Sequence, residues 1–285
     1  MSFFNKWMFN PPERPLGPIP RQDERNVMMS SISGHEIHCQ LTYPHNTPTT
    51  LQDYRGTESI IIFMHGNADD VQSCGSYTQW LANELSCNVV TFDYPGYGFS
   101  SGTKNTSEEG MVEAAECALE LVTNRLKHDM NTVILFGKSI GSFPAVSLAA
   151  KSFCSRIQGL ILVSPMASAA RCVFDSNFVF SFVMKALDFL ALNNLKHIGK
   201  VQSLVLIIHG LQDQIVPVEN SETLKLALNY HSDYPALFVK AQHNDIESKH
   251  KALFLQTLKH FVQTCVVSSE QLTIKIPYDN ELEWE

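Results

Sequence analysis

A serine between two glycines follows an apolar run and is the residue best suited to covalent chemistry. The chain reads Val-Ile-Leu-Phe from position 133 and continues as Gly137-Lys138-Ser139-Ile140-Gly141. This G-x-S-x-G pattern is typical of a strand that turns sharply into a helix and exposes the serine hydroxyl at the strand's carboxyl end. Ordinary strand-to-helix turns carry the same five letters by chance, so the pattern needs partners. Together with a base and a carboxylate elsewhere in the chain, the pattern predicts that Ser139 is a nucleophile.

A serine hydroxyl is a weak nucleophile at neutral pH, so it needs a histidine base and a carboxylate that fixes the histidine tautomer. Asp213 and His243 each stand in a loop directly after an apolar strand-like run. The carboxyl ends of parallel strands meet at one edge of a sheet, which would bring these loops to Ser139. Asp245 is a second carboxylate near His243, but Asp213 has the better strand-end position. We therefore predict Ser139, Asp213 and His243 as the catalytic residues.

The anionic intermediate of acyl transfer requires N–H donors aimed at its oxygen. One donor is expected from Ile140, the residue after the nucleophile. The other is expected from the loop that follows the β-branched run 60–64, where Asn67 and Ala68 occur in the sequence His-Gly-Asn-Ala-Asp. We predict that the backbone N–H of Ile140 forms an oxyanion hole with that of Asn67 or Ala68.

Strand-like and helix-like segments alternate along the chain, which predicts an α/β fold with a parallel sheet covered on both faces. Residues 25 to 43 alternate apolar and polar side chains around a Ser-Gly turn and are expected to form a hairpin. An apolar stripe predicts a helix over 107–127, with Thr106 and Glu109 as a capping box. We expect an N-terminal arm (1–24), one domain (25–266) and a C-terminal tail (267–285).

Composition narrows the function classes. The chain has 285 residues and a net charge of -8, which argues against nucleic-acid binding. Its seven cysteines contain no Cys-x-x-Cys pair and indicate free thiols in a reducing compartment. His35 and His38 are the closely spaced histidines, and three positions apart in a strand they face opposite sides, so we expect no zinc. The proposed chemistry needs no cofactor.

Aromatic residues mark the predicted substrate contacts. The phenylalanine-rich segment around 172–200 is expected to form a lid that lines an acyl-chain pocket with Phe174 and Phe178; a helix packed on the sheet edge is the alternative. Its central charges argue against a membrane span. Tyr97 is a third candidate contact, whereas Asp93 is interpreted as structural and Lys138 as the variable position of the serine motif. For the aromatic N-terminal arm, packing against the domain is favoured over peripheral membrane contact.

Six blocks of sequence resemble the family of α/β-hydrolase domain-containing protein 17, over about residues 25 to 265. They are HGNADD (65 to 70), CNVVTFDYPGYGFSSG (87 to 102), GKSIGSFP (137 to 144), SPMASAAR (164 to 171), LIIHGLQDQIV (206 to 216) and HNDIE (243 to 247). The order Ser, Asp, His along the chain is also that of the α/β-hydrolases. The resemblance implies an α/β-hydrolase fold, with a mostly parallel eight-stranded sheet, helices on both faces and a short helical lid.

The same resemblance implies a serine hydrolase that removes palmitoyl groups from cysteines of membrane-associated proteins. Two features depart from the family pattern. The family has a lipidated cysteine cluster at its N-terminus, whereas the first cysteine here is Cys39. The segment from Cys172 to Val201 is also longer and richer in phenylalanine.

We therefore expect a cytoplasmic serine hydrolase that acts on an acylated protein or a small ester. The reaction is expected to pass through an acyl-enzyme intermediate on Ser139. A general carboxylesterase, lipase or peptidase with the same triad is the alternative. The third interpretation is a non-catalytic binding protein of the same fold. The presence of all the residue types that catalysis requires argues against it.

Overall fold

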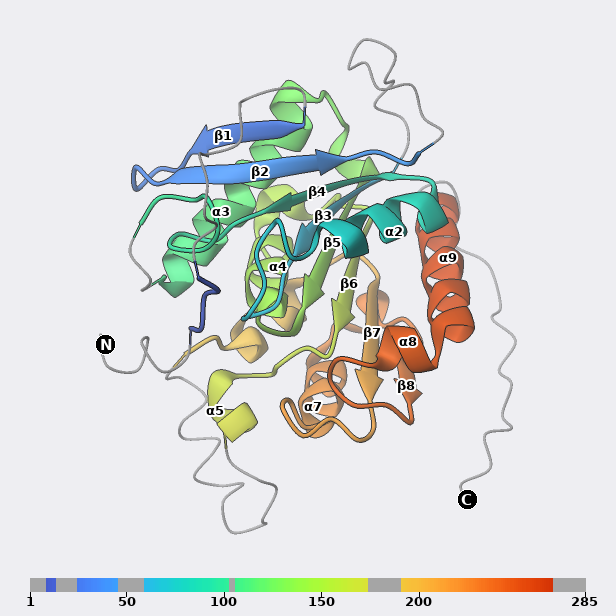
Figure 1. The fold of residues 1–285 in the computed structure, drawn as a ribbon. Coiled ribbons are helices and arrows are strands. Elements are labelled where there is room, and N and C mark those ends of the chain that lie inside the picture. The colour runs from blue at the N-terminus through green and yellow to red at the C-terminus, as the bar shows by residue number, and fades with distance from the viewer. Residues whose placement is uncertain (1–8, 14–24, 46–58, 103–105, 174–190, 269–285) are drawn as a thin grey trace.

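The computed structural model describes residues 9–13, 25–45, 59–102, 106–173 and 191–268. One eight-stranded sheet runs through the molecule in the order β1-β2-β4-β3-β5-β6-β7-β8 (Figure 1). The strands are β1 (Asn26–Ser30), β2 (Glu36–Thr42), β3 (Ile60–Met64), β4 (Asn88–Phe92), β5 (Val133–Lys138), β6 (Gly159–Val163), β7 (Val205–Gly210) and β8 (Leu237–Val239). The helices are α2 (Gly75–Leu85), α3 (Glu108–Glu120), α4 (Ser142–Ala149), α5 (Ala169–Val173), α7 (Glu219–Ala227), α8 (Ile246–Lys249) and α9 (Lys251–Ser268).

Strands β3 to β8 are parallel, and β1 and β2 form an antiparallel edge. The expected hairpin is confirmed, since Asn26 pairs with Gln40 and Ser30 with Glu36. Every residue of β3, β4 and β6 is buried, as strands covered on both faces must be. The mostly parallel sheet predicted from the sequence is therefore confirmed.

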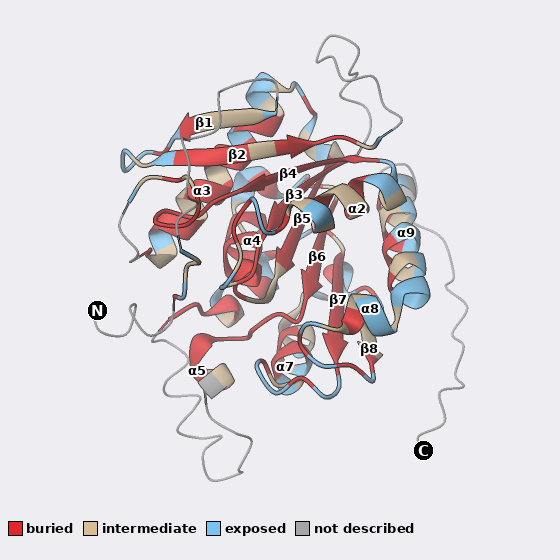
Figure 2. Ribbon diagram, viewed as in Figure 1, coloured by how far each residue is buried: buried red, intermediate tan, exposed pale blue. Residues whose placement is uncertain are grey.

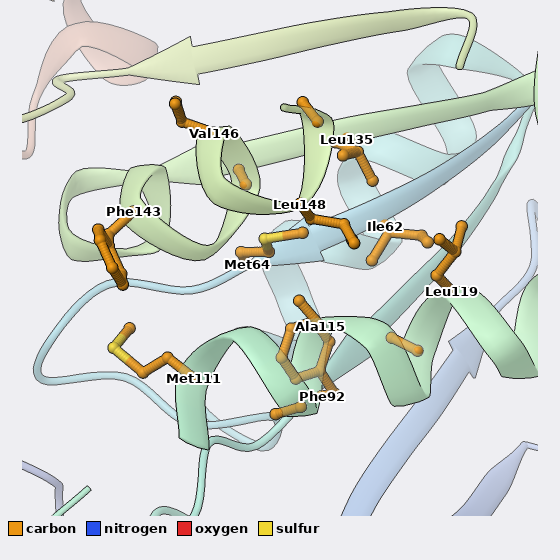
Figure 3. Packing of buried hydrophobic residues seen from close by; sticks show 14 of the residues in the cluster. Ile62, Met64, Phe92, Met111, Ala115, Leu119, Leu135, Phe143, Val146 and Leu148 are labelled. Atoms are coloured by element: carbon orange, nitrogen blue, oxygen red, sulfur yellow. The ribbon is translucent and has the colours of Figure 1, made fainter. Parts of the chain in front are cut away.

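Two hydrophobic clusters cover the two faces of the sheet because side chains alternate along each strand. In β3, Ile60, Ile62 and Met64 face one side and pack in a cluster that includes α3 and α4 residues. Ile61 and Phe63 face the other side, where the cluster includes residues of α2 and α9. Figure 3 shows the first cluster at close range, and Figure 2 shows that buried residues concentrate in the strands and on the sheet-facing sides of the helices.

Helix α3 begins one residue later than its sequence pattern suggests. The predicted cap, Thr106, is wrong: the side chain of Ser107 accepts a hydrogen bond of 3.0 Å from the backbone N–H of Gly110. Ser107 has the extended backbone that an N-cap requires, which lets its oxygen reach the first turn. Glu108 and Glu109 then lie at the positive end of the helix dipole.

Part of the N-terminal arm lies against the domain. Packing of this kind is the arrangement that the sequence favoured over contact with a membrane. The side chain of Phe9 is 5% exposed and belongs to the same cluster as α3 and α4. The central part of the predicted lid (174–190) lies outside the described residues, as does the predicted tail (267–285) except for its first two residues, which belong to α9.

Candidate active site

The turn between β5 and α4 holds Ser139 in a strained backbone conformation. Ser139 has φ of 53°, in the left-handed region that most residues avoid. A β-carbon on Gly141 would lie 2.1 Å from the carbonyl oxygen of Met64, and one on Gly137 would lie 2.6 Å from the carbonyl oxygen of Gly141. Both positions therefore require glycine. The turn is tight enough to place the serine at the end of β5, beside the end of β3.

Three side chains from three different loops meet at this turn. The Nε2 atom of His243 lies 3.0 Å from the Oγ of Ser139, and its Nδ1 lies 2.6 Å from Oδ2 of Asp213. A carboxylate only accepts hydrogen bonds, so Nδ1 carries the proton and Nε2 is left to accept from the serine hydroxyl. The structure thus brings together the residues that the sequence singled out, in the arrangement of a serine nucleophile and its base.

Asp213 is held as a carboxylate by several donors. The backbone N–H groups of Ile215 and Val216 donate to its Oδ1 over 2.9 and 2.8 Å. The Oδ2 atom contacts His209 Nε2 at 3.1 Å in addition to His243. Burial by itself raises the pKa of Asp213, but the hydrogen bonds from His209 and His243 and the attraction to His243 outweigh it and bring the pKa below its ordinary value. Asp213 is therefore ionised at neutral pH.

His209 is a residue of the site that sequence reasoning missed. It is fully buried, and its Nε2 also lies 2.8 Å from the carbonyl oxygen of Val216, which accepts only. Nε2 therefore carries a proton, and the opposite atom, Nδ1, lies 2.5 Å from the hydroxyl of Ser221 at the start of α7. His209 thus positions the Asp213 carboxylate from behind. The only sequence signal was its place at the end of the strand that leads to Asp213.

The loop that carries His243 is fixed by two acidic residues. Asp245 accepts a hydrogen bond of 2.6 Å from the backbone N–H of Gln242 and pairs with Lys249 at 2.7 Å. Glu247 pairs with Lys138 at 2.9 Å, and both side chains are largely buried. Lys138 directly precedes Ser139, so the variable position of the serine motif has a partner here: an ion pair ties the nucleophile turn to the His243 loop.

The predicted oxyanion loop lies at the end of β3. Asn67 is half-buried and Ala68 exposed. The carboxamide oxygen of Asn67 accepts hydrogen bonds from the hydroxyl of Tyr97, at 2.8 Å, and from the backbone N–H of Asn10, at 2.9 Å. Tyr97 is 1% exposed, and burial raises the pKa of its hydroxyl despite the nearby Asn10 amide, so it remains a donor. The structure places Tyr97 beneath this loop.

The remaining predictions concern the lid phenylalanines, metal binding, membrane spans and the cysteines. Phe174 and Phe178 lie outside the described residues. No group of three or more histidine, cysteine or acidic residues in the described ranges is placed to hold a metal ion. None of the described helices combines the length and apolarity needed to cross a membrane. All seven cysteines are free thiols.

A pocket of about 320 Å³ opens beside His243 on the side of the β7 and β8 loops. Its lining consists of Gln214, Ile215, Gln242, His243, Asn244 and Asp245. Of the three candidate catalytic side chains, His243 is the one that lines this pocket.

The fold is that of the α/β-hydrolases. A structure of Est1E from Butyrivibrio proteoclasticus with bound ferulic acid matches 85% of this chain and 99% of its own length, with a TM-score of 0.65 and 18% identity. The Pyrococcus furiosus esterase Pf2001 matches 90% of this chain and 97% of its own, with a TM-score of 0.65 and 15% identity. The family described as serine aminopeptidase, S33, matches residues 56–193, which include Ser139 but end before Asp213 and His243.

Curated relatives define the family more narrowly. α/β-Hydrolase domain-containing protein 17C of Xenopus tropicalis is 34% identical over 208 residues, which are 73% of this chain and 62% of the relative. The human 17B protein is 34% identical over 209 residues, which are 73% of this chain and 67% of the relative. The chain thus spans about three fifths of the length of the 17C relative. It belongs to the α/β-hydrolase domain-containing protein 17 family.

Proposed function

We propose that this protein is a serine hydrolase that uses Ser139, His243 and Asp213 as nucleophile, base and orienting carboxylate. The observation that carries the proposal is the continuous contact from Ser139 Oγ through the His243 ring to Asp213, over 3.0 and 2.6 Å. Membership of a hydrolase family supports it. Against a non-catalytic binding protein stands the strained turn at Ser139, which a binding role does not require.

The proposed reaction has two halves. The Oγ of Ser139 attacks the acyl carbon while His243 Nε2 takes the hydroxyl proton, and the resulting oxyanion is stabilised by the N–H groups proposed above. Collapse breaks the bond to the leaving group, which receives that proton from His243. A water molecule, deprotonated by His243, then attacks the acyl-enzyme; the acid leaves and the proton returns to Ser139.

For the substrate we propose an acyl thioester of a protein cysteine, with a long acyl chain. The family resemblance set out above supports protein depalmitoylation. A thiolate leaves readily, so one histidine and an oxyanion hole suffice for the reaction. The free thiols of the chain fit a cytoplasmic location, with Phe174 and Phe178 proposed as acyl-chain contacts. The alternative substrates are simple esters and peptide amides.

Labelling with a fluorophosphonate probe tests the nucleophile. The native protein should be labelled, and Ser139→Ala should not be, because alanine deletes only the attacking oxygen. Ser155→Ala removes an exposed hydroxyl and serves as the matched control, with labelling as in the native protein. Undiminished labelling of Ser139→Ala would assign the reactivity to another serine.

A chain-length series tests the substrate class. We expect kcat/KM to rise from acetyl to octanoyl to palmitoyl thioesters, since each buried methylene contributes about 0.8 kcal/mol of transfer free energy. A peptide amide should be cleaved more slowly than any of them. A flat profile or a preference for the amide would favour a small-ester hydrolase or a peptidase.

A further inference from the structure

The loop after β3 carries the main chain that the proposed reaction would use to stabilise its oxyanion. The N–H of Asp69 donates to the carbonyl oxygen of Gly66 at 3.3 Å and closes a turn. Asn67 and Ala68 occupy its two central positions, and the turn's own hydrogen bond uses neither of their N–H groups. Strands β3 and β5 are neighbours in the sheet, so this turn lies next to the one that holds Ser139. The direction of its central N–H groups depends on what fixes the turn.

The side chain of Asn67 anchors this turn. Its oxygen accepts hydrogen bonds from the backbone N–H of Asn10, at 2.9 Å, and from the hydroxyl of Tyr97, at 2.8 Å. A backbone N–H only donates, so the atom that it meets must be the carboxamide oxygen, and the Tyr97 hydroxyl must donate as well. Asn67 thereby joins segments that lie 57 and 30 positions away in the sequence.

Tyr97 is itself held rigidly by the loop after β4. Its backbone N–H donates to the carbonyl oxygen of Tyr94 at 2.9 Å, and the two rings pack edge to face at 5.4 Å. Gly98 follows with φ of 43°, and a β-carbon there would lie 2.2 Å from Oδ2 of Asp93. The glycine-containing sequence after β4 therefore serves to present the Tyr97 hydroxyl at a fixed place beneath the Asn67 turn.

The N-terminal arm supplies the other donor. Phe9 is 5% exposed and packs in the cluster that includes α3 and α4 residues, so burial of this ring brings the next residue to the loop. Asn10 precedes Pro11 and Pro12, and a residue before proline favours an extended backbone. The side chain of Asn10 is exposed, and the contact with Asn67 is made by the main chain.

We propose that Tyr97 and the main chain of Asn10 are positioning groups of the active site. By holding the Asn67 side chain, they direct the N–H groups of the turn toward the oxyanion. The inference rests on the proposed hydrolase function, and it makes the N-terminal arm a working part of the site. A purely structural role of the same contacts would change the stability of the fold and leave kcat as it is.

Tyr97→Phe deletes only the hydroxyl and tests the first hydrogen bond. With an octanoyl thioester, kcat should fall about 10- to 100-fold and KM should change less than about twofold, because loss of a whole oxyanion donor costs about 10²- to 10³-fold in kcat and a displaced donor costs part of that. Tyr234→Phe is the matched control. Tyr234 is also buried, and its hydroxyl contacts His260, but it precedes β8 and so lies at the opposite end of the sheet from Ser139. Its loss should leave kcat at the native value.

Asn10→Pro and Asn10→Ala form a pair that isolates the main-chain donor. Proline has no N–H, so Asn10→Pro should lower kcat about tenfold, again at nearly constant KM. Asn10→Ala keeps the N–H and removes only an exposed side chain, so its kcat should be that of the native protein. Urea unfolding of each variant records whether the fold is retained.

An octyl trifluoromethyl ketone separates positioning from a general loss of structure. The Oγ of Ser139 adds to its carbonyl carbon, the carbonyl electron pair moves to the oxygen, and His243 takes the hydroxyl proton. The adduct thus carries the oxyanion of the proposed intermediate. Its Ki should rise in Tyr97→Phe and Asn10→Pro by the same factor by which kcat/KM falls.

The inference is overturned if kcat and Ki keep their native values in Tyr97→Phe and Asn10→Pro, or if the losses appear in KM alone. Either result leaves the hydrolase function standing. A native protein that neither cleaves the thioester nor is labelled by a fluorophosphonate would instead overturn the proposed function, and this inference with it.

Discussion

Two buried aspartates stand at the ends of parallel strands, and each contacts a histidine. Asp93 follows β4, and its Oδ2 lies 3.2 Å from His38 Nδ1; Asp213 follows β7, and its Oδ2 lies 2.6 Å from His243 Nδ1. Each carboxylate also accepts backbone N–H groups, from Val71 and Phe99 in the first case and from Ile215 and Val216 in the second. By these contacts alone, the two pairs could not be assigned different roles.

The two histidine–aspartate pairs differ in the partner of the second ring nitrogen, Nε2. Nε2 of His38 lies 3.3 Å from the side-chain oxygen of Asn26, inside the β1-β2 hairpin. Nε2 of His243 lies 3.0 Å from the Ser139 hydroxyl, and His243 also lines a pocket. A histidine–carboxylate pair thus holds a fold together when both ring nitrogens have structural partners, and can act as a base when one faces a nucleophile.

The largest predicted effect comes from the two histidines. His243→Ala should lower kcat by about 10⁶-fold, because both the base and the acid of the reaction are lost. His38→Ala should leave kcat within a few fold but lower the free energy of unfolding by about 1 to 3 kcal/mol, since the buried Asp93 loses a partner. Steady-state kinetics on an octanoyl thioester and urea unfolding measure the two effects. Equal losses of kcat would erase the distinction between the pairs.

Substitution of the two aspartates, Asp213 and Asp93, should give a smaller difference in kcat than substitution of the two histidines. Asp213→Asn should lower kcat about 10⁴-fold with the active-site geometry retained, because the histidine tautomer and the imidazolium are no longer favoured. Asp93→Asn should act on stability, with a loss of about 1 to 3 kcal/mol, because an amide N–H₂ then opposes a backbone donor. Asp245→Asn is the control for Asp213. A greater loss of kcat in Asp245→Asn would show that the wrong carboxylate has been assigned.

The ion pair between Lys138 and Glu247, which joins the loops that carry Ser139 and His243, should have a modest effect. Lys138→Met and Glu247→Gln should each lower kcat several-fold with KM nearly unchanged, and the double variant should be no worse than either single one, because both break the same contact. Lys138→Arg should restore most of the rate, since it keeps the cation. Additive losses in the double variant would indicate that the pair does not act as a unit.

The smallest effect is a pH dependence of stability. The pKa of Asp213 in the folded protein lies below its ordinary value of 3.8. The ionised carboxylate therefore stabilises the fold above about pH 4, and this contribution is lost as the pH falls through the folded-state pKa. The difference in unfolding free energy between native protein and Asp213→Asn should be constant from about pH 5 to 7 and shrink below about pH 4. A difference that grows in acid would contradict the lowered pKa.

The sequence allowed the fold to be predicted, and also the meeting of Ser139, Asp213 and His243 at one edge of the sheet, because the signals for both are local. Ser139, Asp213 and His243 each stand in a loop just after an apolar run, and parallel strands bring such loops to one edge. The interpretation of Asp93 as structural agrees with its contacts to His38 and to the backbone.

Contacts between distant segments were beyond prediction. The Lys138–Glu247 pair joins residues 109 positions apart, and the His209–Ser221 contact depends on how α7 lies against β7. Neither distance follows from periodicity or composition. The cap of α3 was displaced by one residue because Thr106 and Ser107 have the same capping chemistry, and only the backbone conformation of Ser107 decides between them.

The arrangement of parallel strands has a consequence during synthesis of the chain. Ser139 leaves the ribosome well before Asp213 and His243, and the last two reach it only when β7 and β8 have joined the sheet. Such pairings between distant segments form late in folding. A nascent or partly folded chain carries the serine without its base. Under the proposed function, hydrolytic capacity therefore arises only once β7 and β8 have joined the sheet.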